Sequence, residues 1–158
     1  MRNGKRTPAG EAVTHLILDL FRLNNRLVTA GDRLVFDLGL TSARWQILGA
    51  IVAAERPEPV AWLARNLGAN RQNVQRIVND LKQEGLVTFQ ANPHHRRAQL
   101  VLLTDKGRKT FDAAMGLQAA WISTLSNGLA VKEIETTHRV LTALRVKLEN
   151  HDEVRERT

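Results

Sequence analysis

Apolar residues recur every three or four positions over the first 36 residues, which is the spacing of an α-helix with one buried face. Thr7 followed by Pro8 predicts its start, because a hydroxyl cap and a proline at the first helical position favour helix initiation. The pattern leaves open whether the helix continues past Gly31 or breaks there. Leu18 and Phe21 add a second apolar face, so the helix is predicted to contact both its own domain and another chain. The periodic residues are Val13, Leu16, Ile17, Leu20, Leu23, Leu27 and Val28.

Three shorter helices are predicted between residues 41 and 85. Thr41 or Ser42 caps the first, which the segment from Pro57 to Pro59 closes. The next begins near Pro59 and ends at Gly68, and Asn70 caps the third. The last two resemble a helix-turn-helix, in which two steeply crossing helices need a small residue, a turn glycine and two inward aliphatic residues. Those positions are held by Ala64, Gly68, Val74 and Ile77.

Beyond Gly85 the pattern predicts two strands, over residues 86–90 and 98–103, around a turn at 91–97 rich in proline, histidine and arginine. Thr104 caps a fifth helix that extends to about Leu125, and a sixth follows whose apolar residues at 134, 141 and 148 suit packing along another helix. The predicted fold is mainly α with a small β-hairpin wing. It has a winged helix-turn-helix domain at 41–103, a helical dimerisation region at 7–36 and 104–150, and flexible termini at 1–6 and 151–158.

Composition narrows the function. The 158 residues include no cysteine, which excludes disulfides, thiolate zinc sites and thiol redox sensing. No apolar run has the length of a signal peptide or a membrane span, so a cytoplasmic protein without a membrane partner is expected. The net charge is +7, and residues 60–110 hold nine Lys or Arg against three Asp or Glu. A basic charge concentrated in one region favours binding of a polyanion.

The exposed face of the fourth helix carries side chains suited to reading base edges. Gln72 and Asn73 can pair with adenine and Arg76 with guanine, each good pair giving roughly 1–3 kcal/mol of discrimination. We expect Arg71, Gln75 and Lys82 to bind phosphate at the flanks of the groove. At the wing, His94, His95, Arg96 and Arg97 are placed to reach a neighbouring minor groove. Taken alone, the polar face of the fourth helix could simply be solvated. The basic wing beside it favours DNA binding instead.

The order of these elements resembles the MarR family of bacterial regulators, over residues 10 to 150. The resemblance rests on LGLTSARWQIL before the helix-turn-helix and on GLVTFQANPHHRRAQLVLLTDKGR after it, above all GLV at 85–87, RRA at 96–98 and LTDKG at 103–107. It implies a homodimer that binds a palindromic double-stranded DNA operator, as a transcriptional regulator and more specifically a repressor. It also implies a recognition helix from Asn70 to Glu84 and a wing-tip arginine at Arg97.

One position departs from the family pattern, which usually has an acidic residue two positions before the wing arginine, where this chain has His95. The departure leads to the hypothesis of a pH-sensitive wing, since histidine gains charge between about pH 5 and 8. The resemblance further implies release of the DNA by a small aromatic or phenolic ligand. Trp45 and His15 are candidates to line that pocket, and simple core packing is the alternative for Trp45.

No enzyme motif is present: the sequence has no glycine-rich phosphate loop, no HExxH and no serine elbow, and it predicts neither a catalytic residue nor a cofactor. His94 and His95 are adjacent in an extended turn and therefore point apart, which argues against a metal site. Two alternatives to a sequence-specific regulator stay open. One is a winged-helix module that binds a protein, and the other is an architectural protein that binds DNA without sequence preference.

Overall fold

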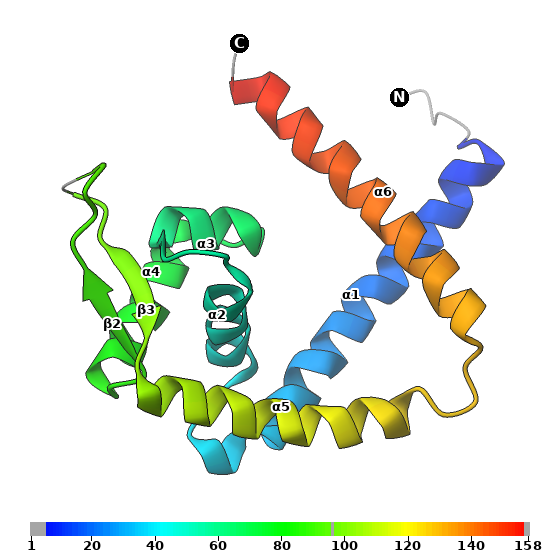
Figure 1. The fold of residues 1–158 in the computed structure, drawn as a ribbon. Helices are drawn as coiled ribbons and strands as arrows, with labels where there is room; N and C mark the ends of the chain where they lie inside the picture. The colour runs from blue at the N-terminus through cyan, green and yellow to red at the C-terminus, as the bar shows by residue number, and fades with distance from the viewer. Residues whose placement is uncertain (1–5, 96, 157–158) are drawn as a thin grey trace. The chain divides into compact units, whose positions relative to one another are not determined.

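The computed structural model describes residues 6–95 and 97–156, with side chains described as far as residue 150. Ten elements follow one another along this part of the chain (Figure 1). They are α1 (Pro8–Leu34), a 3-10 turn η1 (Phe36–Leu38), α2 (Ser42–Ala53), β1 (Glu58–Pro59), α3 (Val60–Asn66), α4 (Arg71–Gln83), β2 (Val87–Gln90), β3 (Leu100–Leu103), α5 (Asp105–Leu125) and α6 (Val131–Glu156).

The predicted helix caps are confirmed. The Thr7 side chain accepts a hydrogen bond from the Gly10 amide, Thr41 rather than Ser42 caps α2, and Asn70 accepts from the amides of Gln72 and Asn73. Each cap satisfies an amide that the first helical turn leaves without a partner. The Thr104 hydroxyl likewise accepts from the Gly107 amide at 3.0 Å, at the start of α5.

Helix α1 continues past Gly31 to Leu34, which settles the question that the sequence left open. Gly31 lies against Ser42 at the start of α2, and a Cβ atom there would come within 2.5 Å of the Ser42 Oγ. Ser42 also donates from its Oγ to the Val28 carbonyl and from its amide to the Asp32 carboxylate. The glycine is therefore explained by the close approach of two helices rather than by a break in one of them.

The wing contains one more strand than the sequence predicted. The hairpin of β2 and β3 is confirmed, with Val87 opposite Leu103 and Gln90 opposite Leu100. The short strand β1 pairs with the other edge of β3, which gives an antiparallel sheet in the order β1-β3-β2. Since β1 is two residues long and includes a proline, it has no alternating pattern from which a strand could be predicted.

The hydrophobic core of the described residues is formed by the segment from Val35 to Ala114. Leu48, Val78 and Leu81 are completely buried, and they bring together α2, α4 and the sheet. By contrast, Gly31 is the only residue of α1 classed as buried, and none of the described side chains of α6 is buried. The core therefore fixes α3, α4 and the wing on α2 and leaves much of the long helices without a covering layer.

The chain divides into two compact units, with the boundary between Ala119 and Ala120, inside α5. The first unit contains α1, the helix-turn-helix, the sheet and the start of α5, and the second contains the end of α5 and α6. Among the described residues, no helix is long and apolar enough to cross a membrane.

Candidate nucleic-acid interface

The turn between α3 and α4 has the geometry that the sequence predicted. Gly68 has a φ of +59°, in the left-handed region that costs glycine little, and the chain reverses there. Ala64 is buried at the crossing, where its small side chain lets α3 approach α4 closely. Val74 and Ile77 are buried on the inner face of α4, as predicted. The helix is thus fixed along one side and free along the other.

The free side of α4 is polar. Gln72, Asn73 and Arg76 are exposed there, and Arg76 donates from Nη2 to the Asn73 side-chain oxygen at 2.9 Å. Its Nη1 lies 3.7 Å from the Asp80 carboxylate, and the Arg76 side chain is 68% exposed. These contacts hold the guanidinium beside the amide while leaving it open to a ligand. The arrangement can present hydrogen-bond donors and acceptors together to a nucleic-acid groove.

The wing turn is ordered by hydrogen bonds to its own backbone. The amide of His94 donates to the Asn92 side-chain oxygen at 2.9 Å, and the Ala98 amide donates to the His95 carbonyl at 3.0 Å. Both histidine residues and Arg97 are exposed. Arg96, the remaining wing candidate, lies outside the described residues.

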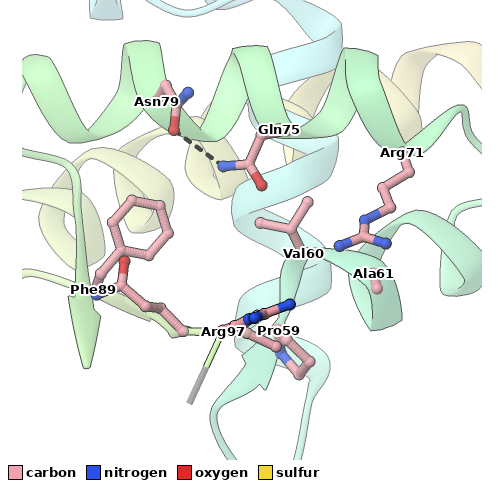
Figure 2. Close-up of a pocket in the computed structure, with 10 residues that line it drawn as sticks. Pro59, Val60, Ala61, Arg71, Gln75, Asn79, Phe89 and Arg97 are labelled. Carbon is pink, nitrogen blue, oxygen red and sulfur yellow. Dashed lines mark hydrogen bonds between the residues drawn. The ribbon is translucent and has the colours of Figure 1, made fainter. Parts of the chain in front are cut away.

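A hollow of about 190 Å³, open to solvent, lies between the start of α3, the outer side of α4 and the wing, and two arginines contribute to its wall (Figure 2). Arg71 is the first residue of α4, and Arg97 belongs to the wing. The Gln75 amide donates to the Asn79 side-chain oxygen at 3.0 Å along the α4 wall. The lining residues are Pro59, Val60, Ala61, Arg71, Gln75, Asn79, Phe89, Arg97, Ala98 and Gln99.

The carboxyl end of α4 is tied to its neighbours. The Arg44 guanidinium lies 2.8 Å from the Glu84 carboxylate, and the Lys106 ammonium donates to the Glu84 carbonyl. The Lys82 ammonium lies 5.0 Å from the centre of the Phe89 ring, within the range of a cation–π contact. The amino-terminal half of α4 is therefore the half whose cations and amides are open to a ligand.

The predicted site residues fall into separate groups. Gln72, Asn73 and Arg76 lie on one exposed face, Arg71, Gln75 and Arg97 share the hollow, and Lys82 contacts the wing. Sequence reasoning did not identify Asn79 and Phe89 as site residues. Asn79 lies one helical turn beyond Gln75, a spacing that could have identified it. Phe89 gave no local signal, because its role comes from the packing of the wing against α4.

The two residues predicted to line an effector pocket lie apart. Trp45 is buried in the hydrophobic core, and His15 is exposed on α1. Neither belongs to the hollow beside α4. Over the described part of the chain, no group of three histidine, aspartate or glutamate residues is arranged to hold a metal ion.

This chain is similar in sequence to known proteins. A family model described as the MarR family matches residues 38–98. An uncharacterised protein of Mycobacterium tuberculosis, Rv2011c, is 39% identical over 103 residues, which span 65% of this chain and 71% of the relative. The transcriptional activatory protein BadR of Rhodopseudomonas palustris is 32% identical over 107 residues, which span 65% of this chain and 59% of BadR.

Solved structures share the fold. The transcriptional repressor CouR, bound to a 23-mer DNA duplex, is 26% identical with a TM-score of 0.74, covering 89% of this chain and 99% of CouR. The organohalide-sensing regulator RdhR, in its 2,4-dichlorophenol-bound form, has a TM-score of 0.76 at 17% identity, covering 93% of this chain and 88% of RdhR. The likeness to RdhR is one of fold alone.

Proposed function

This chain belongs to the MarR family of DNA-binding transcriptional regulators, which are not enzymes, and from that premise we propose that it binds a palindromic operator as a homodimer. In this proposal residues 41–103 form the DNA-binding domain, and residues 7–36 with 104–150 form the dimerisation region. The observation that carries the proposal is the exposed face of α4, where Gln72, Asn73 and Arg76 lie together on a helix whose other face is fixed in the core.

We assign reading of base edges to Gln72, Asn73 and Arg76, because amide and guanidinium groups can form paired hydrogen bonds in the major groove. Asn70 caps the helix that carries them. The contacts that position the helix on the backbone are assigned to Arg71, Gln75 and Lys82, and contacts of the wing to His94, His95 and Arg97. Arg76 is already held by Asn73 and Asp80, so it loses little conformational freedom on binding.

Selection from a random duplex pool tests this function most directly. The full chain is mixed with the pool at moderate salt, bound duplexes are recovered and sequenced, and a scrambled site is measured at the same salt. An inverted repeat with half-sites about 10 bp apart, or a multiple of that, is expected of a two-fold dimer. Strong binding without an enriched motif would favour an architectural role, and no binding would favour a protein-interaction module.

The base-reading assignment makes a separate prediction. Gln72→Ala and Arg76→Ala should each weaken binding to the selected operator about 5-fold to 100-fold, while binding to random duplex changes little. Gln83→Ala, at the far end of the same helix, is the matched control and should leave both affinities unchanged. Equal losses on operator and random DNA would assign Gln72 and Arg76 to the backbone instead.

The dimer is supported by the apolar surface of the long helices. On α1, Ile17, Phe21 and Val28 are exposed on one face, so Phe21 lies with the periodic residues and not on the second face that the sequence predicted for it. Helix α6 exposes Ile134, Val140 and Val146. A soluble monomer rarely leaves this much apolar surface in contact with water. We propose that a second copy of the chain covers it.

For the sign of regulation we propose repression, in line with CouR, the DNA-bound relative, although BadR is described as an activatory protein. Fusing the selected operator to a reporter promoter and supplying the regulator separates the two: repression predicts that expression falls, and activation that it rises.

We also propose that a small aromatic or phenolic ligand releases the operator, as the 2,4-dichlorophenol-bound form of RdhR suggests. Burial of Trp45 in the core favours a packing role for it over a role in ligand binding. Titrating the protein–operator complex with 2,4-dichlorophenol tests the idea. A rise in the apparent Kd would support it, and an unchanged Kd would contradict release by this phenol.

A further inference from the structure

The hollow beside α4 is lined by two arginines, Arg71 and Arg97, and, among the described residues that line it, by no acidic side chain (Figure 2). Within the described part of the chain, neither guanidinium forms an ion pair or a hydrogen bond, whereas Arg44 and Arg76 do both. Two unpaired cations that line one small space favour an anion between them. The hollow is therefore suited to a negatively charged group.

The size and position of the hollow indicate which anion it takes. At about 190 Å³ it is smaller than the 300–1,000 Å³ typical of pockets for drug-sized ligands. It lies between α4, which is assigned to the major groove, and the wing beside it. In a duplex, each sugar-phosphate strand separates a major groove from the neighbouring minor groove. A strand that passed between the recognition helix and the wing would lie over this hollow.

We propose that Arg71 and Arg97 bind the same phosphodiester of the DNA backbone, one from the recognition helix and one from the wing. This inference rests on the proposed DNA-binding function and changes one assignment within it: Arg97, expected from the sequence to enter a minor groove, binds the backbone beside that groove instead. The planar guanidinium groups can each donate two hydrogen bonds to phosphate oxygens. One shared phosphate would thus contact both elements that the core already holds side by side.

Removing single phosphate charges tests the proposal. In a series of operator duplexes, each duplex carries one uncharged methylphosphonate linkage at a different position. The Kd for each duplex is measured for the wild-type chain, for Arg71→Gln, for Arg97→Gln and for the variant that carries both substitutions. The wild type should lose about tenfold in affinity at one linkage in each half-site, the size expected for loss of a charge-assisted hydrogen bond. Each single variant should respond less than the wild type at that same linkage, because one arginine still faces the phosphate, and the variant that carries both substitutions should be insensitive there. All variants should keep the wild-type response at the other linkages. A reduced response at two different linkages, one for each variant, or at none, would overturn the proposal.

The salt dependence of binding to random duplex gives a second readout that needs no operator. Each neutralised phosphate contributes about 0.9 to the slope of log K against log salt. With one shared phosphate, Arg71→Gln combined with Arg97→Gln should lower the slope by about 0.9 per bound chain, and two separate phosphates would lower it by about 1.8. Arg22→Gln, an exposed arginine on α1, is the control, and circular dichroism checks that each variant is folded.

These outcomes separate the inference from the proposed function. If the wild-type chain binds DNA but the two arginines act at different phosphates, only the shared contact is wrong. If the wild-type chain binds no DNA at all, the proposed function fails and the shared contact fails with it.

Discussion

Gly107, in the first turn of α5, packs directly against the backbone where the recognition helix ends. A Cβ atom at this position would collide with the carbonyl oxygen of Leu86. That carbonyl cannot move freely, because it accepts hydrogen bonds from the Thr104 amide at 3.1 Å and from the Thr104 hydroxyl at 3.2 Å. The glycine in the LTDKG segment is therefore explained by close packing of α5 on the end of the helix-turn-helix.

Gly107→Ala should lower the free energy of unfolding by about 1–3 kcal/mol, the usual cost of forcing an extra carbon into a packed site. Urea denaturation at a fixed protein concentration measures the change. Gly116→Ala is the matched control, because it lies on the same helix and a Cβ there meets nothing within 4 Å. We expect the control to gain about 0.4–1 kcal/mol. A loss of equal size at both positions would show that the collision at Gly107 is not the cause.

Among the elements, α4 depends on its N-cap residue, Asn70, in two ways that can be measured separately. Asn70 caps the helix through the amides of Gln72 and Asn73, and it lies next to Arg71 in the hollow. Aspartate can make the same cap but adds a negative charge, and alanine removes the cap without adding charge. The two substitutions therefore affect folding and DNA binding differently.

Asn70→Ala should lower the free energy of unfolding by about 1 kcal/mol, whereas Asn70→Asp should leave it nearly unchanged. Binding to duplex DNA should follow a different order, since the aspartate would repel the phosphate backbone, and Asn70→Asp should raise Kd at least about fivefold. Thermal unfolding and fluorescence anisotropy measure the two quantities on the same samples. Equal DNA affinity of Asn70→Asp and the wild-type chain would place this end of α4 away from the phosphates.

Local signals predicted most elements, and the failures come from contacts between residues far apart in the sequence. Thr7, Thr41, Asn70 and Thr104 each identified a helix start, because capping depends on side chains within three residues of the amide they satisfy. Strand β1 was not predicted, since its pairing of Glu58 with Val101 joins residues far apart in the sequence. The end of α1 was ambiguous for the same reason: the contact that requires glycine at position 31 comes from α2.

At the scale of the whole molecule, the exposure of the polar side chains of α4 could be predicted from the sequence, and their grouping with the wing could not. An exposed amphipathic face is a property of one helix, so Gln72, Asn73 and Arg76 could be found from spacing alone. The hollow that joins Arg71 to Arg97 depends on how the wing packs against α4, and no local pattern encodes that packing. The charge balance of residues 60–110 indicated a polyanion, but it could not indicate that two arginines share one space.

The apolar surface of α1 gives the prediction that concerns the whole assembly. Phe21 is 63% exposed on the same face as Ile17 and Val28, and the proposed dimer would bury it. An aspartate at that position would have to enter the interface as an unpaired charge, which costs several kcal/mol. Phe21→Asp should therefore weaken dimerisation about a hundredfold or more. Sedimentation equilibrium should give the mass of two chains for the wild type and of one chain for the variant at micromolar concentration.

Gln46→Asp is the matched control for this experiment, because Gln46 is exposed on α2, outside the proposed dimerisation region. It should keep the dimer mass and the wild-type affinity for the inverted repeat. The Phe21→Asp chain should bind a single half-site and a full operator with nearly the same affinity, since a monomer gains nothing from a second half-site. If Phe21→Asp kept the dimer mass, the α1 stripe would not be the interface. If the wild-type chain had the mass of one chain, the proposed dimer would be wrong. The reason to expect a palindromic operator would then be lost as well.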